Sequence, residues 1–249
     1  MSEASSLANK TILVTGAGKR IGRAVALALA GKGAHIVAHY RSSADEAKSL
    51  VDAIHESSGE AWSVQADLGD AEEADALIGR AVSVAGPLDA LVNSASIFPN
   101  ATLGEFGPDE LARNIQVNAY APLQLARHFA AQGIPGHIVN FLDARMVDYD
   151  HEHVPYHLSK RMLFALTREM AAEFAPAVQV NAIAPGLILP PENKDEAYLE
   201  SLVHTNYLQR HGSVDDLART VVFLLESPFI TGEVIYVDGG RHMRGSFYG

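Results

Sequence analysis

The chain contains no cysteine among its 249 residues. It therefore cannot form disulfides, bind zinc through thiolates or use a cysteine nucleophile, and this composition fits a reducing compartment. Basic residues are also scarce, because 19 lysines and arginines stand against 30 aspartates and glutamates, giving a net charge of −11. A chain this acidic has no overall field that attracts nucleic acid or an anionic membrane. Any phosphate that it binds must be held by a local site.

Long apolar runs are missing as well. Runs such as residues 24–30 and 221–225 are far too short to cross a bilayer. The first ten residues, MSEASSLANK, contain neither a basic segment nor an apolar one, so we expect no signal peptide. These absences predict a cytoplasmic protein with a small-molecule substrate and with no nucleic-acid or membrane partner.

Short β-branched segments alternate with longer amphipathic ones along the chain. The predicted strands are residues 11–15, 35–39, 61–66, 90–93, 137–141, 178–182 and 234–237. The predicted helices are residues 21–32, 43–57, 71–85, 108–132, 155–175 and 214–226. With right-handed crossovers, this alternation predicts one α/β domain over residues 1–249, a doubly wound, Rossmann-type parallel sheet of about seven strands with helices on both faces. Ligands on such sheets bind at the carboxyl ends of the strands.

One irregular stretch interrupts this alternation. Residues 185–191 are rich in proline and glycine, and a polar segment follows them as far as residue 212. Because the stretch comes directly after the carboxyl end of a predicted strand, we expect residues 187–212 to form a lid over the site.

A glycine-rich turn joins the first predicted strand to the first predicted helix. Gly16, Gly18 and Gly22 lie in this turn, and the helix opens near Ile21. Glycines allow a tight turn and a close approach of the backbone to a ligand, and the unpaired N–H groups of a helix N-terminus favour a phosphate. Because the turn begins a repeated βαβ series, we interpret it as the phosphate loop of a dinucleotide site.

The end of the second predicted strand indicates which dinucleotide binds. NAD-dependent enzymes usually place an acidic residue there for the ribose 2′-hydroxyl, whereas this chain has Tyr40, Arg41 and Ser42. A guanidinium matches the geometry of a phosphate group. Arg20, in the glycine turn, is a second candidate for the 2′-phosphate or the pyrophosphate. These residues predict NADP(H) as the cofactor.

Tyr156 and Lys160 lie four residues apart on a predicted helix and therefore share one face. An ammonium beside a phenol favours the phenolate and lowers the phenol pKa. We therefore expect Tyr156 to act as a general acid with the help of Lys160. The spacing by itself is common on solvated helix faces, so its meaning depends on the rest of the chain.

The chain resembles the short-chain dehydrogenase/reductase family over nearly its whole length. The resemblance rests on six motifs in order: TGAGKRIG (15–22), QADL (65–68), LVNSAS (91–96), VNAYAP (117–122), VNAIAPG (180–186) and ITGEVIYVDGG (230–240). It implies that Asp67 contacts the adenine, that Asn93 shapes the end of the fourth strand and that Asn118 is an active-site residue. The segment that ends at Gly186 is expected to border the nicotinamide.

The turn and the resemblance together predict the following cofactor-binding residues: Gly16, Gly18, Arg20, Ile21, Gly22, Tyr40, Arg41, Ser42, Asp67, Leu68, Asn93, Ser94, Ala95, Tyr156, Lys160, Pro185, Gly186 and Ile188. The predicted catalytic residues are Asp143, Tyr156, Lys160 and Asn118.

Three departures from the family pattern are informative. Position 20 is Arg where most members have Gly, and position 94 is Ser where Asn is usual. The place of the catalytic Ser, thirteen residues before Tyr156, is taken by Asp143. Together with HYRSS, SxF at 96–98 and GGRHMR at 239–244, these departures are similar to pteridine reductases and dihydromonapterin reductases. That resemblance implies that Phe98 stacks on a pterin ring.

An aspartate in the serine place has a chemical rationale. Reduction of a C=N bond requires a proton on nitrogen, and a pterin presents an edge rich in hydrogen-bond donors. A carboxyl group beside a tyrosine is expected to accept those donors or to relay a proton through the phenol. The predicted substrate-binding residues are Arg20, Ser96, Phe98, Asp143, Tyr156, Gly186 and Leu187.

Two other functions fit the same residues. One is a carbonyl reductase that acts on a sugar, a steroid or an acyl thioester, although Asp143 disfavours it. The other is a catalytically silent NADP-binding sensor, which the pairing of Tyr156 with Lys160 disfavours. Acidic residues and histidines gather in residues 148–153, but their spacing is not that of a metal site, and we expect no metal.

Members of the family are commonly tetramers, and we expect a homotetramer here. The predicted helices 108–132 and 155–175 carry more apolar residues than one sheet face needs: Leu123, Leu125, Phe129, Phe164, Leu166 and Phe174. The tail at residues 241–249 is expected to reach a neighbouring subunit's site, with Arg244 as a candidate contact.

Overall fold

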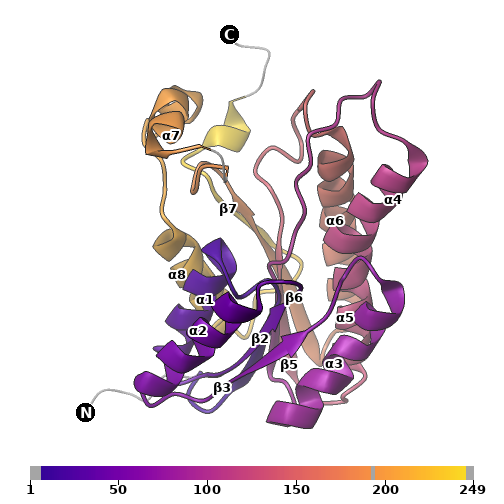
Figure 1. Ribbon diagram of the computed structural model, residues 1–249, viewed down its shortest axis with the longest axis vertical. Helices are drawn as coiled ribbons and strands as arrows, with labels where there is room; N and C mark the ends of the chain where they lie inside the picture. The colour runs from indigo at the N-terminus through magenta and orange to yellow at the C-terminus, as the bar shows by residue number, and fades with distance from the viewer. Residues whose placement is uncertain (1–6, 192–193, 245–249) are drawn as a thin grey trace.

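The computed structural model describes residues 7–191 and 194–244 and confirms the predicted fold. Seven parallel strands form one sheet in the order β3-β2-β1-β4-β5-β6-β7 (Figure 1). The strands are β1 Thr11–Val14, β2 His35–Tyr40, β3 Ala61–Gln65, β4 Ala90–Asn93, β5 Gly136–Phe141, β6 Val178–Pro185 and β7 Val234–Val237.

The strand order reverses at β1, which pairs with β2 on one side and with β4 on the other. In register, Val14 at the end of β1 lies beside Ala38 of β2 and Val92 of β4. A parallel sheet of this order has a crevice where the order reverses, at the carboxyl ends of the strands. The segments that leave β1 and β4 should therefore form the walls of a ligand site.

Helices cover both faces of the sheet (Figure 1). One layer contains α1 Arg20–Ala30, α2 Ala44–Glu56 and α8 Val214–Leu225. The other contains α3 Ala71–Ala85, α4 Pro108–Ile115, α5 Ala121–Ala130 and α6 Val154–Glu173. Successive strand residues point to opposite layers, so Leu13 packs in one apolar core and Ile12 in the other. Burial on both faces explains why the strands are apolar throughout.

The helix that we expected over residues 108–132 is instead interrupted. Between α4 and α5 lies a π-helical turn, Gln116–Tyr120, in which the N–H of Ala121 donates to the carbonyl of Gln116. Pro122 has no N–H, so the carbonyl of Asn118 cannot accept the usual bond from four residues ahead. The turn places Asn118 in the interior of the protein, where its side chain is fully buried.

Two other predicted boundaries were wrong. The sixth strand continues past residue 182 to Pro185, because residues 182–185 pair with β7. Part of the expected lid is helical, with α7 Glu196–Leu202 followed by a 3-10 turn, Val203–Thr205. A last 3-10 turn, Arg241–Met243, follows β7.

Several predictions fall on residues that the structure does not describe. Residues 192–193 of the expected lid and 245–249 of the expected tail lie outside the described ranges, as do the first six residues of the segment considered for a signal peptide. Among residues 7–191 and 194–244, no helix is both long and apolar enough to cross a membrane.

The apolar residues assigned to a subunit contact lie mostly inside the subunit. Leu125 and Phe129 are fully buried in the core. The four others are partly buried and pack against the same core: Leu123, Phe164, Leu166 and Phe174. The excess of apolar residues on these helices therefore reflects the thickness of the core beneath them.

Candidate active site

The glycine turn after β1 requires glycine at two positions. Gly16 has a φ of +66°, and a Cβ there would lie 3.0 Å from the Cα of Ala95. A Cβ at Gly22 would lie 2.3 Å from the carbonyl oxygen of Gly16. The turn is thus as tight as the sequence predicted, and its backbone is open to a ligand at the start of α1.

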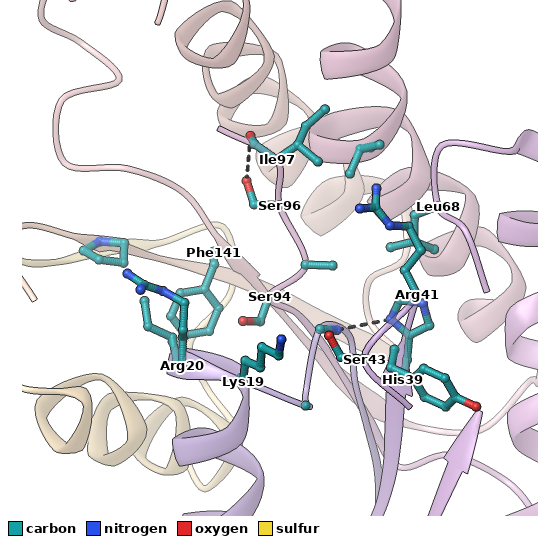
Figure 2. Close-up of a pocket in the computed structure, with 18 of the residues that line it drawn as sticks. Lys19, Arg20, His39, Arg41, Ser43, Leu68, Ser94, Ser96, Ile97 and Phe141 are labelled. Atoms are coloured by element: carbon teal, nitrogen blue, oxygen red, sulfur yellow. Dashed lines mark hydrogen bonds between the residues drawn. The ribbon is translucent and has the colours of Figure 1, made fainter. Parts of the chain in front are cut away.

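A buried histidine that the sequence analysis missed holds this turn. The Nδ1 atom of His39 accepts the N–H of Gly16 at 3.1 Å, and its Nε2 atom donates to the carbonyl of Ala66 at 3.1 Å (Figure 2). Burial lowers the pKa of His39 from 6.5 to about 4, so the ring is neutral and its tautomer is set by these two bonds. The signal that could have identified His39 is its place directly after the apolar residues 36–38 of the strand.

Thr15, also missed, joins the ends of β1 and β4. Its Oγ1 atom accepts the N–H groups of Ser94 and Ala95, each at 3.0 Å. Asn93 donates through Nδ2 to Oδ1 of Asn140 at 2.9 Å and does not line the cavity. Asn93 therefore links the ends of β4 and β5, and its contact with the cofactor stays a prediction.

A cavity of about 510 Å³ opens where the strand order reverses (Figure 2). Most of the predicted residues line it: Gly16, Gly18, Arg20, Ile21, Gly22, Tyr40, Arg41, Ser42, Asp67, Leu68, Ser94, Ala95, Ser96, Asp143, Tyr156, Lys160, Pro185, Gly186 and Ile188. Residues that the sequence analysis did not assign also line it: Lys19, His39, Ser43, Ile97, Val117, Phe141, Leu142 and Leu189. Leu187, which is predicted to bind the substrate, lines a neighbouring cavity beside β7.

Cations stand at two separate places in the cavity wall. Arg41 lies on one side of the cavity and Arg20 on the opposite side (Figure 2). The Nη2 atom of Arg20 donates to the carbonyl of Pro190 at 2.6 Å, which joins the glycine turn to the segment after β6. The two arginines therefore stand apart in this structure, and the expectation that both contact the 2′-phosphate stays a prediction.

The backbone at Arg20 is strained. Its φ of +51° lies in the left-handed region, where a residue other than glycine costs roughly 1 kcal/mol or more. Most family members have glycine at this position, whereas this chain keeps an arginine that reaches into the cavity wall. The strain and the bond to Pro190 together indicate that the side chain has a role at the site.

The central pair of the site is Tyr156 and Asp143. Tyr156 lies in the first turn of α6 and is 7% exposed, and Asp143 follows β5. The Tyr156 hydroxyl donates to Oδ2 of Asp143 at 2.9 Å, while the Arg145 N–H donates to Oδ1 at 2.7 Å. Burial and the Asp143 carboxylate raise the pKa of Tyr156 well above its usual value. Our expectation of a lowered pKa was wrong, because these effects oppose the ammonium.

Lys160 is buried one helical turn beyond Tyr156. Its Nζ atom donates to the carbonyl of Phe141 at 2.7 Å and lies 5.7 Å from the centre of the Tyr156 ring. Burial lowers the pKa of Lys160 from 10.5 to about 8. The ammonium is thus held by the end of β5, within reach of the same end of the cavity.

Asn118 acts on the site from behind the cavity wall. Its Oδ1 atom accepts Ser96 Oγ at 3.0 Å and the Ile97 N–H at 2.8 Å, and its Nδ2 atom donates to Ser159 Oγ at 3.0 Å. It does not line the cavity itself. Asn118 therefore holds the segment after β4 against α6 and sets the position of Ser96.

Phe98 lies just outside the cavity wall, next to Tyr156. Its half-exposed ring meets the Tyr156 ring edge to face, with centres 4.5 Å apart, and packs on His153 with centres 3.8 Å apart. A backbone bridge between Ala101 and His153 joins the two loops that carry these rings. Phe98, the predicted stacking residue, is thus beside Tyr156, although the ring of His153 already covers part of the Phe98 ring.

The acidic and histidine-rich loop before α6 forms an ion-pair network centred on Asp150. This carboxylate lies 2.9 Å from Nη1 of Arg145 and 3.3 Å from Nε2 of His157, and it also accepts the N–H of His153 at 3.1 Å. Burial raises the pKa of Asp150, but the Glu152 N–H and Arg145 outweigh this effect and hold the pKa below its usual value. The network links the loop of Asp143 to the histidine beneath Phe98.

The chemistry of the two ends of the cavity differs. Around Arg41 the wall offers cations, serine hydroxyls and the N-terminus of α1, which together suit phosphates. Around Tyr156 it offers a buried hydroxyl hydrogen-bonded to a carboxylate, with an ammonium nearby, which suits proton transfer.

Comparisons with known proteins show which family the chain is similar to. A family model described as Enoyl-(Acyl carrier protein) reductase matches residues 16–242. The chain is 32% identical to 3beta-hydroxysteroid dehydrogenase 1 of Eggerthella lenta over 97% of both sequences, and 32% identical to the 3-oxoacyl-(acyl-carrier-protein) reductase FabG of Staphylococcus aureus over 94% of this chain and 98% of that one. The crystal structure of FolM Alternative dihydrofolate reductase 1 from Brucella canis, complexed with NADP, superposes with a TM-score of 0.91 at 35% identity, covering 97% of each chain.

Proposed function

Because this chain belongs to the short-chain dehydrogenase/reductase family, we propose that it is an NADPH-dependent reductase whose substrate is a dihydropteridine. The reaction adds a hydride to carbon and a proton to nitrogen of one C=N bond and yields the tetrahydropteridine. The observation that carries the proposal is the 2.9 Å hydrogen bond from Tyr156 to an aspartate in the place of the family's serine.

The cavity wall fits NADP(H). A Cβ at Gly22 would fill the turn against the Gly16 carbonyl, so the backbone shape that receives a pyrophosphate depends on glycine. At the adenosine end, Arg41 lines the cavity directly after β2, where NAD-dependent enzymes have an acid, and Lys19 of the glycine turn lines the cavity as well. We assign the 2′-phosphate to Arg41 and Lys19 and the pyrophosphate end of the turn to Arg20. The relative from Brucella canis was solved with NADP.

The protein's own part in the reaction is proton transfer. When bound, the cofactor supplies the hydride. Tyr156 donates its proton to the substrate nitrogen, and its raised pKa keeps the phenol protonated until then. A phenolate beside an ionised Asp143 would be opposed by like-charge repulsion. The Asp143 carboxylate accepts the Tyr156 hydroxyl and thereby fixes its position, and Lys160 stabilises the negative charge that develops on the phenol as its proton leaves for the substrate nitrogen.

The residues around this pair suit a flat, polar ring. The half-exposed ring of Phe98 beside Tyr156 provides an aromatic surface, and aromatic contact contributes about 0.5–1.5 kcal/mol beyond burial. Ser96, fixed by Asn118, and Arg20, fixed by Pro190, provide polar groups for the edge of a pterin. A puckered sugar or a flexible chain would leave these groups poorly matched.

The second candidate is carbonyl reduction, which the comparisons favour. Both relatives at 32% identity, the 3beta-hydroxysteroid dehydrogenase and the 3-oxoacyl reductase, are named for such chemistry. A ketone oxygen accepts hydrogen bonds, and an ionised carboxylate in the serine place has none to donate. The Asp143 side chain is thus the feature that separates the two candidates.

The decay of NADPH absorbance tests the proposal. The unmodified protein is assayed with dihydrobiopterin, dihydromonapterin and dihydrofolate, and beside them with a steroid ketone, a 3-oxoacyl thioester and simple ketones. We expect turnover of at least one dihydropteridine and little or no turnover of the carbonyl compounds. Turnover of ketones without pteridines would replace the proposal with carbonyl reduction. Tight NADPH binding without turnover of any compound would favour a silent sensor.

We also propose that the protein assembles as a homotetramer. Leu158 and Met162 lie one turn apart on α6, and more than a third of the surface of each side chain is exposed. An apolar pair at this spacing on a helix surface fits a contact between subunits. Light scattering at micromolar concentration should give four times the mass of one chain, and a monomer would refute the assembly.

A further inference from the structure

Arg241 begins the 3-10 turn that follows β7, and its backbone is firmly set. Gly239 and Gly240, just before it, have φ values of +64° and +83°, a left-handed pair that glycine adopts without strain. The Asp238 carboxylate accepts the N–H of Gly240 at 2.9 Å and the N–H of His242 at 2.6 Å. The direction in which Arg241 leaves the sheet is therefore determined by Asp238.

This turn lies at the substrate end of the cavity. A Cβ on Gly186, which lines the cavity, would lie only 2.6 Å from the Cα of Asp238. On the other side of β6, the N–H of Ala144 donates to the carbonyl of Pro185 at 2.9 Å. The carboxyl ends of β5, β6 and β7 are neighbours in the sheet, so Asp143, Gly186 and Arg241, which follow these strands, lie at one edge of the sheet.

The guanidinium of Arg241 differs from the other cation at this edge. Arg145 is paired with Asp150 at 2.9 Å and with the carbonyl of Tyr149 at 2.8 Å. Arg241 is half-buried, yet within residues 7–191 and 194–244 its guanidinium has neither a hydrogen bond nor a salt bridge. A half-buried cation without a partner is costly and is usually matched by an anion from elsewhere.

The charged groups that act on the Arg241 guanidinium agree with a position near Asp143. Burial lowers the pKa of Arg241, and the positive charge of Arg145 lowers it further, while Asp143 and Tyr198 oppose the shift. Arg241 is therefore within electrostatic reach of the catalytic carboxylate on one side and of α7 on the other.

We propose that Arg241 binds an anionic group on the side chain of the substrate, beyond the ring that is reduced. This inference rests on the proposed function and narrows it to pteridines with a carboxylate or a phosphate on the side chain. A guanidinium pairs with either group through two parallel hydrogen bonds, and both groups are fully charged at neutral pH. Phe98 and Tyr156 would hold the ring while Arg241 holds the tail.

Equilibrium binding tests the inference without depending on turnover. The dissociation constants of folate, of pterin and of a pterin with a phosphorylated side chain are measured by fluorescence quenching in saturating NADP⁺. The unmodified protein should bind at least one of the anionic compounds about tenfold or more tightly than neutral pterin. Arg241→Gln should remove that difference and leave the affinity for pterin unchanged, and Arg241→Lys should restore part of it.

Arg219→Gln serves as the matched control, because it removes the same charge from an exposed pair with Asp216 on α8. It should leave all three constants unchanged. Equal affinity of the unmodified protein for pterin and for both anionic compounds would overturn the inference. An equal loss of affinity for all three compounds in Arg241→Gln would also overturn it, because Arg241 would then act by positioning Asp143 and not by binding an anionic group. Failure of the proposed function is separate, since it appears as absent turnover of every pteridine by the unmodified protein.

Discussion

In the cofactor half of the cavity, the wall is held mainly by backbone groups and neutral side chains. Glycines at 16 and 22 shape the turn, His39 and Thr15 fix it through hydrogen bonds to N–H groups, and burial keeps His39 uncharged. In the substrate half, the wall is held by charges. Asp143 and Asp150 hold Tyr156, Arg145 and His157, and the Arg241 guanidinium has no hydrogen bond or salt bridge within the described residues.

This difference has a chemical reason. NAD and NADP share the same pyrophosphate, and a backbone cradle of glycines binds it without side-chain specificity. A substrate is particular to each enzyme, and its recognition depends on side chains placed by loops. Changes in one half should therefore leave the properties of the other half almost unaltered, and the predictions below test that separation.

The largest effect is expected from Tyr156→Phe. This change removes the hydroxyl that protonates the substrate but keeps the ring that packs on Phe98. Turnover of a dihydropteridine should fall at least 100-fold, because general acid catalysis contributes about that much or more. The dissociation constant for NADPH, measured by fluorescence titration, should stay within about twofold. Near-normal turnover would contradict the proposed proton transfer.

Asp150→Asn is expected to have the next largest effect. The amide keeps the shape but removes the close ion pairs of Arg145 and His157, leaving Arg145 only its longer contact with Asp148, which disturbs the turn that holds Asp143. We expect kcat/KM for the dihydropteridine to fall about tenfold, with NADPH affinity unchanged.

Glu152→Gln is the matched control, since it removes a charge from the same loop at an exposed side chain. Its kinetics should match those of the unmodified protein. If both variants lost activity equally, the loop would act through its total charge rather than through Asp150.

Arg41→Ala addresses the cofactor half. Loss of one charge-assisted contact to the 2′-phosphate should weaken NADPH binding about tenfold and leave NADH binding nearly unchanged. Arg23→Ala, whose guanidinium contacts the Glu46 carbonyl on α2, should change neither constant. Equal affinity of the unmodified protein for both cofactors would show that the absence of an acid after β2 does not select NADPH.

A smaller effect is expected on the stability of the folded protein at acidic pH, where His39 is the titrating group. His39 stays neutral in the folded protein down to about pH 4, whereas in the unfolded chain it takes up a proton near pH 6.5. The unfolded state therefore binds more protons between these values, and stability should fall as pH drops from 6.5 through 4.

His39→Gln, which keeps a hydrogen-bonding side chain without a titrating ring, should lose less in this range. Between pH 6.5 and pH 4, the Tm of the unmodified protein should fall on the order of 5 °C more than the Tm of His39→Gln. Parallel loss in both proteins would mean that other groups cause the acid sensitivity.

The site residues that could be predicted from the sequence differ from those that could not in how far their partners lie along the chain. The glycines, Arg41, Tyr156, Lys160 and Asp143 are recognisable because their motifs are local and their spacing is fixed by a strand or a helix. The hydrogen bonds of His39 and the position of Arg241 within electrostatic reach of Asp143 could not be recognised in the sequence. Their partners lie 23 to 98 residues away along the chain and meet only across the sheet.

Two errors have particular causes. The break in the helix at Asn118 depends on the missing N–H of Pro122, a signal that was present in the sequence and was overlooked. The pKa of Tyr156 was expected to fall because Lys160 was considered alone. The actual balance includes full burial and the carboxylate of Asp143, whose effects a sequence pattern does not weigh.

The central claim is that an aspartate in the serine place directs this fold towards a C=N bond. The most direct test is the ratio of kcat/KM for a dihydropteridine to kcat/KM for a ketone, measured in the unmodified protein and in Asp143→Ser. We predict that the ratio falls at least tenfold in the variant, through lower pteridine turnover, while NADPH affinity stays the same. A ratio that is unchanged or higher in Asp143→Ser would contradict the claim.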